Sequence, residues 1–147
     1  MRTILVLTLL ASASATDDWL RFRGPNGSGV SETAGIPAVF GAGRNLSWKS
    51  SVPFGRSSPV VAGNRIFLTA SEGEKLITLC LDRISGKIIW RTEAARARHM
   101  TIFKGNDAAS PTPVSDGTNV YAFFAELGLI SYGPDGRERW RALARPV

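Results

Sequence analysis

Residues 76–91, LITLCLDRISGKIIWR, predict a strand, a tight turn and a second strand that contains Trp90. A degenerate copy, GLISYGPDGRERWR, occupies residues 128–141 and contains Trp140. In the first strand both alternating sets of side chains are largely apolar, so we expect both faces of its sheet to be covered. The two copies together predict an all-β fold built from antiparallel hairpins.

Each hairpin is preceded by two further short strand patterns that turn residues separate. Pro59 and Gly63 match Pro113 and Gly117 at a spacing of 54 residues, and the turn glycines and the tryptophans of the two hairpins are 50 apart. A period near 50 made of four strands is typical of β-propeller blades. The expected strands are residues 57–61, 65–69, 76–82 and 87–91, then 111–114, 119–124, 128–132 and 137–141.

We therefore predict two four-stranded antiparallel blades, at about 57–91 and 110–141. Residues 92–109 between them are expected to form a long surface loop, in which 93–98 could make one turn of helix. The last strand of each blade is the most charged, which favours a position at the outer edge of its sheet.

The composition is that of a globular protein: of 147 residues, 44% are hydrophobic and 20% are charged, with a formal net charge of +6. The 18 basic residues are scattered along the chain, whereas a nucleic-acid-binding protein would cluster them on one face. We expect a solvated basic surface and no nucleic-acid partner. Cys80 is the single cysteine, so it cannot form an intramolecular disulfide and is expected to be a small buried side chain.

Residues 1–15 have the pattern of a secretory signal peptide: Arg2, an apolar run at 4–10 that is too short to span a bilayer, and small residues at 13–15. A buried first strand is the alternative. We predict that the mature protein begins at Thr16 and is periplasmic or extracellular. No cysteine follows the apolar run and no other segment resembles a membrane span, so neither a lipoprotein anchor nor a membrane span is expected.

Residues 16–47 are rich in glycine and lack periodicity, which predicts an extended amino-terminal arm. The arm is expected to lead into a first short strand at 46–49, which contains Trp48. Residues 48–147 are then predicted to be the partial propeller.

The first hairpin contains the pattern Leu81-Asp82-x-x-Ser85-Gly86-Lys87-x-x-Trp90. This pattern resembles the repeat of the pyrroloquinoline-quinone (PQQ) β-propeller superfamily, in which an aspartate, a Thr/Ser-Gly turn, a lysine and a tryptophan recur in every blade. The second copy keeps Gly136 and Trp140, but it has Gly133 for the aspartate, Arg137 for the lysine and a turn that differs by one residue. The opening residues 19–29, WLRFRGPNGSG, also look like the start of secreted, uncharacterised members of that superfamily.

The resemblance spans about residues 19–141, and it implies a structural role for the residues of the repeat. The glycine closes a tight turn, and the tryptophans pack one blade onto its neighbour. The residues to which this role is assigned are Asp82, Gly86, Lys87, Trp90, Gly136 and Trp140.

Closing a propeller ring takes about four to eight blades, so two blades leave it incomplete, and the resemblance implies a ring of seven or eight. We expect the chain to be an amino-terminal fragment of a longer propeller, or a truncated product, with the missing blades of the parent chain as its partner. A dimer or higher assembly that closes the ring is the alternative. By resemblance, the Trp48 strand would complete the outer edge of a blade built at the far end of the parent.

Groups that could carry chemistry are few. Asn106, Asp107 and Ser110 precede the first strand of the second blade, where propellers often place binding groups, so they form a weak ligand-loop hypothesis. Glu126 could line an opening but is interpreted as an exposed loop carboxylate, and His99 as a surface residue. No catalytic, cofactor-binding or metal-binding residues are predicted.

The leading hypothesis is an exported, non-catalytic PQQ-like propeller that binds or scaffolds other extracytoplasmic proteins. The alternative is the amino-terminal part of a PQQ- and calcium-dependent quinoprotein dehydrogenase whose catalytic residues lie in other blades. A third hypothesis, a polyanion-binding protein that uses the scattered arginines, is weaker. An enzymatic role is therefore left open but not favoured, and PQQ and calcium are expected only under the alternative.

Overall fold

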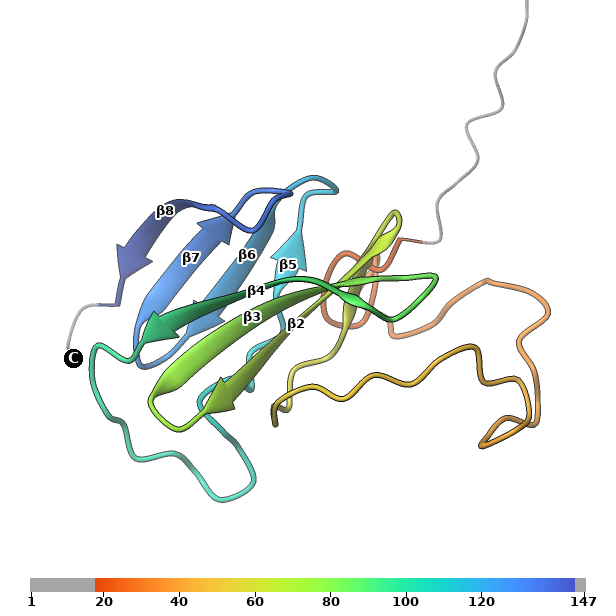
Figure 1. Ribbon diagram of the computed structural model, residues 1–147, viewed down its shortest axis with the longest axis horizontal. Helices are drawn as coiled ribbons and strands as arrows, with labels where there is room; N and C mark the ends of the chain where they lie inside the picture. The colour runs from red at the N-terminus through yellow and green to blue at the C-terminus, as the bar shows by residue number, and fades with distance from the viewer. Residues whose placement is uncertain (1–17, 145–147) are drawn as a thin grey trace, which may run out of the picture.

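The structure is a computed structural model that describes residues 18–144, and these residues contain eight β-strands and no helix (Figure 1). The strands form two four-stranded antiparallel sheets, β1-β2-β3-β4 and β5-β6-β7-β8. The predicted all-β fold with two such sheets is confirmed. The strands are β1 Val60–Ala62, β2 Arg65–Glu72, β3 Lys75–Asp82, β4 Ile88–Ala95, β5 Val114–Ser115, β6 Val120–Phe124, β7 Gly128–Tyr132 and β8 Glu138–Leu143.

The first sheet is organised around β3, in which every residue from Leu76 to Leu81 is buried. β3 pairs with β2 and with β4, so Cys80 lies opposite both Phe67 and Trp90. Because side chains alternate across a strand, one face of the sheet carries Phe67, Cys80 and Trp90, and the other carries Ile77 and its neighbours in register. Both faces are covered, as predicted.

The second sheet has the same arrangement around β7. Ser131 lies opposite Trp140 as Cys80 lies opposite Trp90. Each sheet also has a register shift at the corresponding place, after Cys80 in β3 and after Ser131 in β7. The edge strands β4 and β8 are the most exposed, which fits their high charge.

The two sheets pack face to face, with Trp90 at their interface (Figure 1). The indole of Trp90 lies 5.9 Å from the ring of Phe67 in its own sheet and 6.0 Å from the ring of Tyr132 in the other. Side chains of both sheets form one apolar core. Its buried members are Val60, Ala62, Phe67, Leu76, Cys80, Ala94, Ala108, Ala109, Val120, Ala122, Phe124, Leu127, Ile130 and Tyr132.

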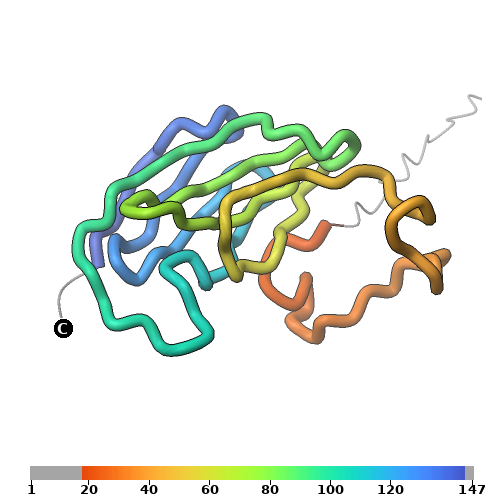
Figure 2. The backbone as a smooth tube through the Cα atoms, turned by 60° about the horizontal axis from the view of Figure 1, so that its bottom comes forward, coloured from red at the N-terminus to blue at the C-terminus, as the bar shows by residue number. Residues whose placement is uncertain are grey.

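The opposite face of the first sheet forms a second, smaller core around Ile77, Leu79 and Leu81. The segment 48–57, gold to yellow in Figure 2, runs along this sheet. At one end Trp48 contacts the β3–β4 turn, and at the other the carbonyl of Phe54 accepts a hydrogen bond of 2.9 Å from the N–H of Ser71. A single extended segment thus lies where a further sheet could pack.

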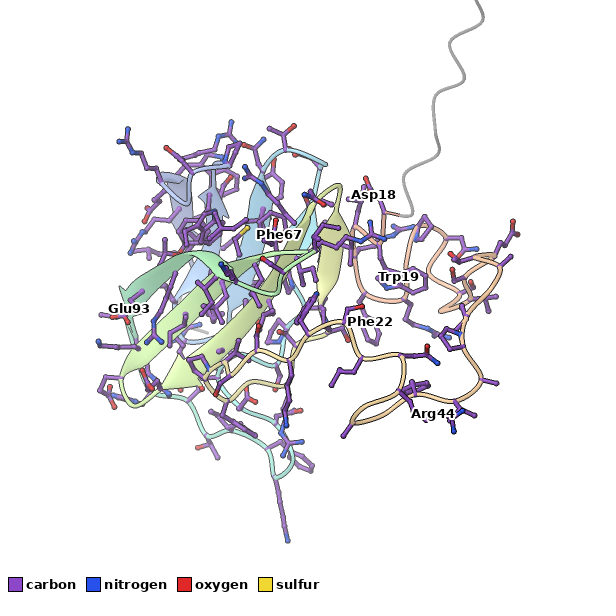
Figure 3. The ribbon with its side chains drawn as sticks, turned by 45° about the vertical axis from the view of Figure 1, so that its right-hand side comes forward. Asp18, Trp19, Phe22, Arg44, Phe67 and Glu93 are labelled. Atoms are coloured by element: carbon purple, nitrogen blue, oxygen red, sulfur yellow. The ribbon has the colours of Figure 1, made fainter. Side chains whose placement is uncertain are left out.

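The amino-terminal arm is tied to the edges of both sheets. Trp19 exchanges two backbone hydrogen bonds with Val61 of β1, and the carbonyl of Leu20 accepts one of 2.9 Å from Ser115 of β5. Figure 3 shows Trp19 beside the first sheet, whereas Arg44 lies at the outlying end of the arm. Residues 18–20 therefore link β1 to β5.

Several sequence predictions are wrong in detail. The first strands of the two blades were predicted at 57–61 and 111–114, but β1 and β5 contain only Val60–Ala62 and Val114–Ser115. Residues 46–49 are extended but form no strand, because no described segment pairs with their backbone. β4 continues to Ala95, where a strand end, a loop and a turn of helix were predicted, because its backbone pairs with the start of β3 and Glu93 forms an ion pair of 2.7 Å with Lys75. The predicted signal peptide, residues 1–15, lies outside the described residues. Among the described residues no helix is available to span a membrane.

Candidate functional site

A pocket of about 220 Å³ opens between the β4–β5 loop and the turn that joins β6 to β7. The three residues of the ligand-loop hypothesis, Asn106, Asp107 and Ser110, all line it. The structure therefore brings the predicted residues together at one cavity. The other lining residues are Met100, Thr101, Ile102, Phe103, Ala108, Pro111, Ala125 and Glu126.

The polar wall of the pocket is a compact turn. The N–H of Asp107 donates to Ser110 Oγ at 2.8 Å, and Asp107 Oδ1 accepts from the N–H of Ala109 at 2.7 Å. The hydroxyl of Thr69, in β2, donates to the carbonyl of Ala109 at 2.9 Å. These bonds fix the loop to the first sheet before β5 begins.

The opposite wall contains Glu126, which is 2% exposed. Its Oε2 lies 2.6 Å from Nη1 of Arg96, and its Oε1 accepts from the N–H of Met100 at 2.9 Å. The interpretation of Glu126 as an exposed carboxylate was wrong, because the β4–β5 loop folds over it and supplies both partners. Arg98 secures the same loop by donating to the carbonyls of Ala125 and Ala144.

Both carboxylates of the pocket form ion pairs with arginines that lie outside its lining. Two carboxylates and no lysine, arginine or histidine line it. Glu126 is paired with Arg96, but Asp107 Oδ2 is buried and has no hydrogen-bond partner. Nε of Arg56 lies 3.9 Å from that oxygen, close enough for an ion pair but too far for a hydrogen bond.

No group in the described residues 18–144 assembles three or more histidine, cysteine, aspartate or glutamate side chains around a common point. His99 is exposed, as predicted, and its Nε2 lies 3.3 Å from a carboxylate oxygen of Glu74, which is also exposed. The sequence indicated the pocket loop and the possibility that Glu126 lines an opening, which it does, but it missed the anchors Arg96 and Arg98. The available signal was the pair of arginines, separated by one residue, directly after β4.

The residues of the repeat pattern lie in the β3–β4 and β7–β8 turns. Asp82 Oδ1 accepts from the N–H and the hydroxyl of Ser85, each at 2.7 Å, and these bonds lower the pKa of Asp82 below its usual value. Gly86 and Gly136 have φ of 70° and 80°, in the left-handed region that glycine favours. The Lys87 side chain is exposed, and Lys87 takes part in the turn only through its backbone: its carbonyl accepts from the N–H of Asp82, and its N–H donates to Ser85 Oγ.

Each turn glycine lies beneath a tryptophan from elsewhere in the chain. Trp90 donates from Nε1 to the carbonyl of Pro134 at 3.1 Å, and a Cβ on Gly136 would lie 2.7 Å from its ring. Trp48 donates to the carbonyl of Arg83 at 3.0 Å, and a Cβ on Gly86 would lie 2.3 Å from its ring. A side chain at either position would therefore require the indole to move. Trp140 is 42% exposed.

No protein-family model matches the chain, and no curated protein matches it.

Proposed function

We propose that residues 57–141 are two consecutive blades of a PQQ-like β-propeller that acts outside the cytoplasm as a non-catalytic binding or scaffolding module. The missing blades, which would bring the ring to seven or eight, are supplied by the parent polypeptide. The proposal rests on one observation, the repeated docking of a tryptophan onto the glycine turn of the next sheet.

The docking has a direction. Trp90 belongs to the edge strand of the first sheet and covers the Gly136 turn of the second. An interface in which one face of a unit meets a different face of the next is heterologous, and its repetition gives a ring when the rotation closes. Blades of a propeller are related in this way.

The uncovered face of the second sheet supports a continuing stack. In the first sheet, Val60, Phe67 and Trp90 lie on the face that packs against the second sheet. The corresponding residues of the second sheet are Val114, Tyr121 and Trp140. The first and last of these are 44% and 42% exposed, and their neighbour Phe123 is 43% exposed. Exposed apolar side chains gathered on one face of a sheet are typical of an interaction surface.

Trp48 provides the other end of the stack. It covers the Gly86 turn as Trp90 covers the Gly136 turn, although residues 46–49 pair with no strand. The segment therefore occupies the position of the edge strand of a preceding blade. A sheet that adds its strands to this segment would complete that blade and close the ring.

Imaging of the natural protein, purified from the extracytoplasmic fraction of its producing cell, tests the proposal. Single-particle electron microscopy should show a closed ring of sheets, with the Trp140 indole over a glycine turn of a third sheet. An isolated pair of sheets with that face in water, or a recovery of the protein only from the cytoplasm, would contradict it.

A second measurement separates the binding module from the dehydrogenase. The natural protein is titrated with PQQ and calcium, and bound-quinone absorbance and dye-linked alcohol oxidation are recorded. Neither signal is expected for a non-catalytic module. A bound quinone with alcohol oxidation would replace the module by the enzyme while leaving the ring intact.

A further inference from the structure

We propose that Asn26 is a site of spontaneous covalent modification, in which its side chain cyclises onto Gly27 and is converted to aspartate and isoaspartate. The inference goes beyond the proposed function and is independent of it, because the reacting groups lie in one turn of the amino-terminal arm, residues 23–29. Water is the co-reactant. The residue after the asparagine, two hydrogen bonds to the amide oxygen and the charge of the turn each support the proposal.

The first support is the residue that follows the asparagine. Asn26 is the only one of the five asparagines that is followed by glycine. The attacking group is the main-chain nitrogen of the next residue, and a Cβ there crowds its approach to the side-chain carbonyl carbon. Gly27 has no Cβ, and apart from its chain neighbours no described residue lies within 4 Å of the position that a Cβ would take. The residues after the other asparagines are Leu46, Arg65, Asp107 and Val120.

The carboxamide of Asn26 is held over the peptide bond that attacks it. Its Oδ1 accepts hydrogen bonds from the N–H of Ser28 at 2.9 Å and from the Ser28 hydroxyl at 2.6 Å. A side chain that bonds to the N–H two residues on folds back over the peptide between them, and here this is the peptide of Gly27. Asn26 is exposed, so water reaches the site.

The same two hydrogen bonds stabilise the charge that develops in the reaction. When the nitrogen adds to Cγ, Oδ1 becomes an oxyanion, and donors already directed at that oxygen lower the barrier. The hydroxyl is oriented for this role, because Ser28 Oγ accepts a hydrogen bond of 3.1 Å from the N–H of Val30. The hydrogen of the hydroxyl is therefore left to point toward Asn26.

The charge of the turn also favours the reaction. Arg21 donates to the carbonyl of Pro25, directly before Asn26, and Arg23 donates to the carbonyl of Ser28 at 3.1 Å. The turn itself contains no aspartate or glutamate. Nearby cations favour the negatively charged form of a group, so the two guanidiniums assist both the loss of the amide proton and the formation of the oxyanion.

The reaction balances with water alone. Hydroxide removes the proton of the Gly27 N–H, and the nitrogen forms a bond to Cγ of Asn26. The Cγ–Nδ2 bond breaks, and Nδ2 takes a proton from water and leaves as ammonia, so a succinimide ring remains. Water then opens the ring at Cγ, which gives aspartate, or at the main-chain carbonyl, which gives isoaspartate. The net change is the uptake of water and the release of ammonia.

One hydrogen bond must open before the nitrogen can react. The Gly27 N–H donates to the carbonyl of Gly24 at 3.2 Å, whereas the turn is closed by a shorter bond of 2.8 Å from the Gly29 N–H to the carbonyl of Arg23. The turn can therefore stay closed while Gly27 is released.

The test is incubation of the purified chain in buffers of increasing pH, followed by peptide mapping with mass spectrometry. The peptide that contains Asn26 should acquire the mass of the amide-to-acid exchange, with isoaspartate among the products, at a rate that rises with hydroxide concentration. The other four asparagines are internal controls. Absence of isoaspartate at Asn26, or its formation at the other asparagines at the same rate, would overturn the proposal.

The role of the Ser28 hydroxyl is tested by two substitutions. Ser28→Ala removes one donor to the oxyanion and should slow the reaction about fivefold, the factor for one hydrogen bond. Ser28→Thr keeps the hydroxyl and should retain the rate. The matched control is Ser31→Ala, at another exposed serine of the arm, whose hydroxyl donates to Thr33 at 2.8 Å. Equal rates in Ser28→Ala and the wild type would contradict this role.

The role of charge is tested by Arg23→Gln, which should slow the reaction severalfold. Arg44→Gln is the control, because Figure 3 shows Arg44 at the outlying end of the arm. An equal effect of both substitutions would mean that the general charge of the chain, and not the turn, sets the rate.

Two further variants test the ring closure itself. Gly27→Ala should reduce the rate at Asn26 to that of the other asparagines. Because alanine is strained at the φ of 72° found here, Asn26→Gln provides an independent check that leaves Gly27 in place. Its longer side chain would have to close a larger ring, so no ammonia should be released from this position. Ammonia released by Asn26→Gln as fast as by the wild type would place the reaction elsewhere in the chain and leave the propeller proposal standing.

The isoaspartate product should loosen the turn. It adds one carbon to the main chain between Arg23 and Gly29, so it strains the hydrogen bond that holds the Arg23 carbonyl. Trypsin should therefore cleave after Arg23 faster in the isoaspartate form than in the Asn26→Asp variant, which keeps the acceptor for Ser28. Equal cleavage of the two forms would contradict this consequence.

Discussion

The two sheets present the same face in two environments. In the first sheet, Phe67 and Trp90 have ring centroids 5.9 Å apart at an interplanar angle of 40°, and they are covered by the second sheet. In the second sheet, Tyr121 and Trp140 are 6.0 Å apart at 42°, and Trp140 remains 42% exposed. The geometry of the aromatic pair is the same with and without a neighbouring sheet.

The comparison separates what a sheet determines alone from what its neighbour adds. In both sheets the two rings come from strands on either side of a small central residue, Cys80 or Ser131. Strand pairing therefore sets the distance and angle of the rings. The neighbour contributes burial and one hydrogen-bond acceptor for the indole N–H, and each of these has a measurable energy.

The largest effect should come from removing the two tryptophans in turn. Trp90→Ala deletes contacts with Phe67, Tyr132 and the Gly136 turn, so the free energy of unfolding should fall by about 3 kcal/mol. Trp140→Ala, at the uncovered position, should lower it by about 1 kcal/mol. Chemical denaturation of both variants measures the difference.

Equal losses of unfolding free energy in Trp90→Ala and Trp140→Ala would contradict the difference between the two faces, because they would mean that Trp140 is already covered in solution. Size-exclusion chromatography at several concentrations then shows whether a second copy provides the cover. In the natural protein the two losses should become similar if a third sheet packs there, as we propose.

The next effect concerns the turn beneath Trp90. Gly136→Ala introduces a Cβ at 2.7 Å from the indole and a side chain at φ of 80°, so it should cost about 2 kcal/mol. Gly117→Ala has a φ of 95° but open space around it, and it should cost about 1 kcal/mol. Thermal unfolding measures both losses of stability. Equal losses would show that the Trp90 indole moves aside for the new Cβ at no energetic cost.

Much of this architecture could be predicted from the sequence because the local signals agree with the tertiary structure. Gly63, Gly86 and Gly136 mark turns that require a positive φ, and the apolar alternation in β3 has both faces covered. The strand ends were less predictable. No glycine or proline after Arg91 marks where β4 ends. The strand extends to Ala95 because its backbone pairs with the start of β3, a contact that the local sequence does not reveal.

The pocket and the position of Trp48 show where sequence alone is insufficient. Asn106, Asp107 and Ser110 were proposed from their place before a strand, but the burial of Glu126 depends on Arg96, thirty residues earlier in the chain. Trp48 meets its turn 35 residues further on without forming a strand. Contacts between distant segments of this kind leave no local periodicity.

A smaller effect is expected at Cys80, the central residue of the covered face. Burial raises the pKa of the Cys80 thiol from 9.0 to about 11, so its thiol should react with disulfide reagents at pH 8 only as fast as the protein unfolds. Cys80→Ala should cost about 1 kcal/mol near neutral pH. Labelling rates in buffer and in denaturant measure the protection, and fast native-state labelling would contradict the buried interface.

The pH dependence of the same variant has a defined sign. The folded state favours the neutral thiol, so its contribution to stability is complete below pH 9 and is lost as the pH rises through about 11. The stability difference between the wild type and Cys80→Ala should therefore be constant below pH 9 and narrow above it. A difference that grows in this window would mean that the thiolate is stabilised.

The smallest effect is expected at the turn in which the two hairpins differ. Asp82 accepts two hydrogen bonds from Ser85, whereas Gly133 at the matching position has no side chain and its turn still closes through the Gly133–Arg137 backbone bond of 2.9 Å. Asp82→Gly should therefore leave the first hairpin folded and reduce stability less than the other substitutions.

Because the two hydrogen bonds from Ser85 lower the pKa of the Asp82 carboxylate, its contribution to stability is present above the usual pKa of 3.8 and is lost as the pH falls through the lower folded pKa. Unfolding curves of the wild type and Asp82→Gly should converge in acid. A difference that persists there would assign the role of Asp82 to the backbone of the turn rather than to its charge.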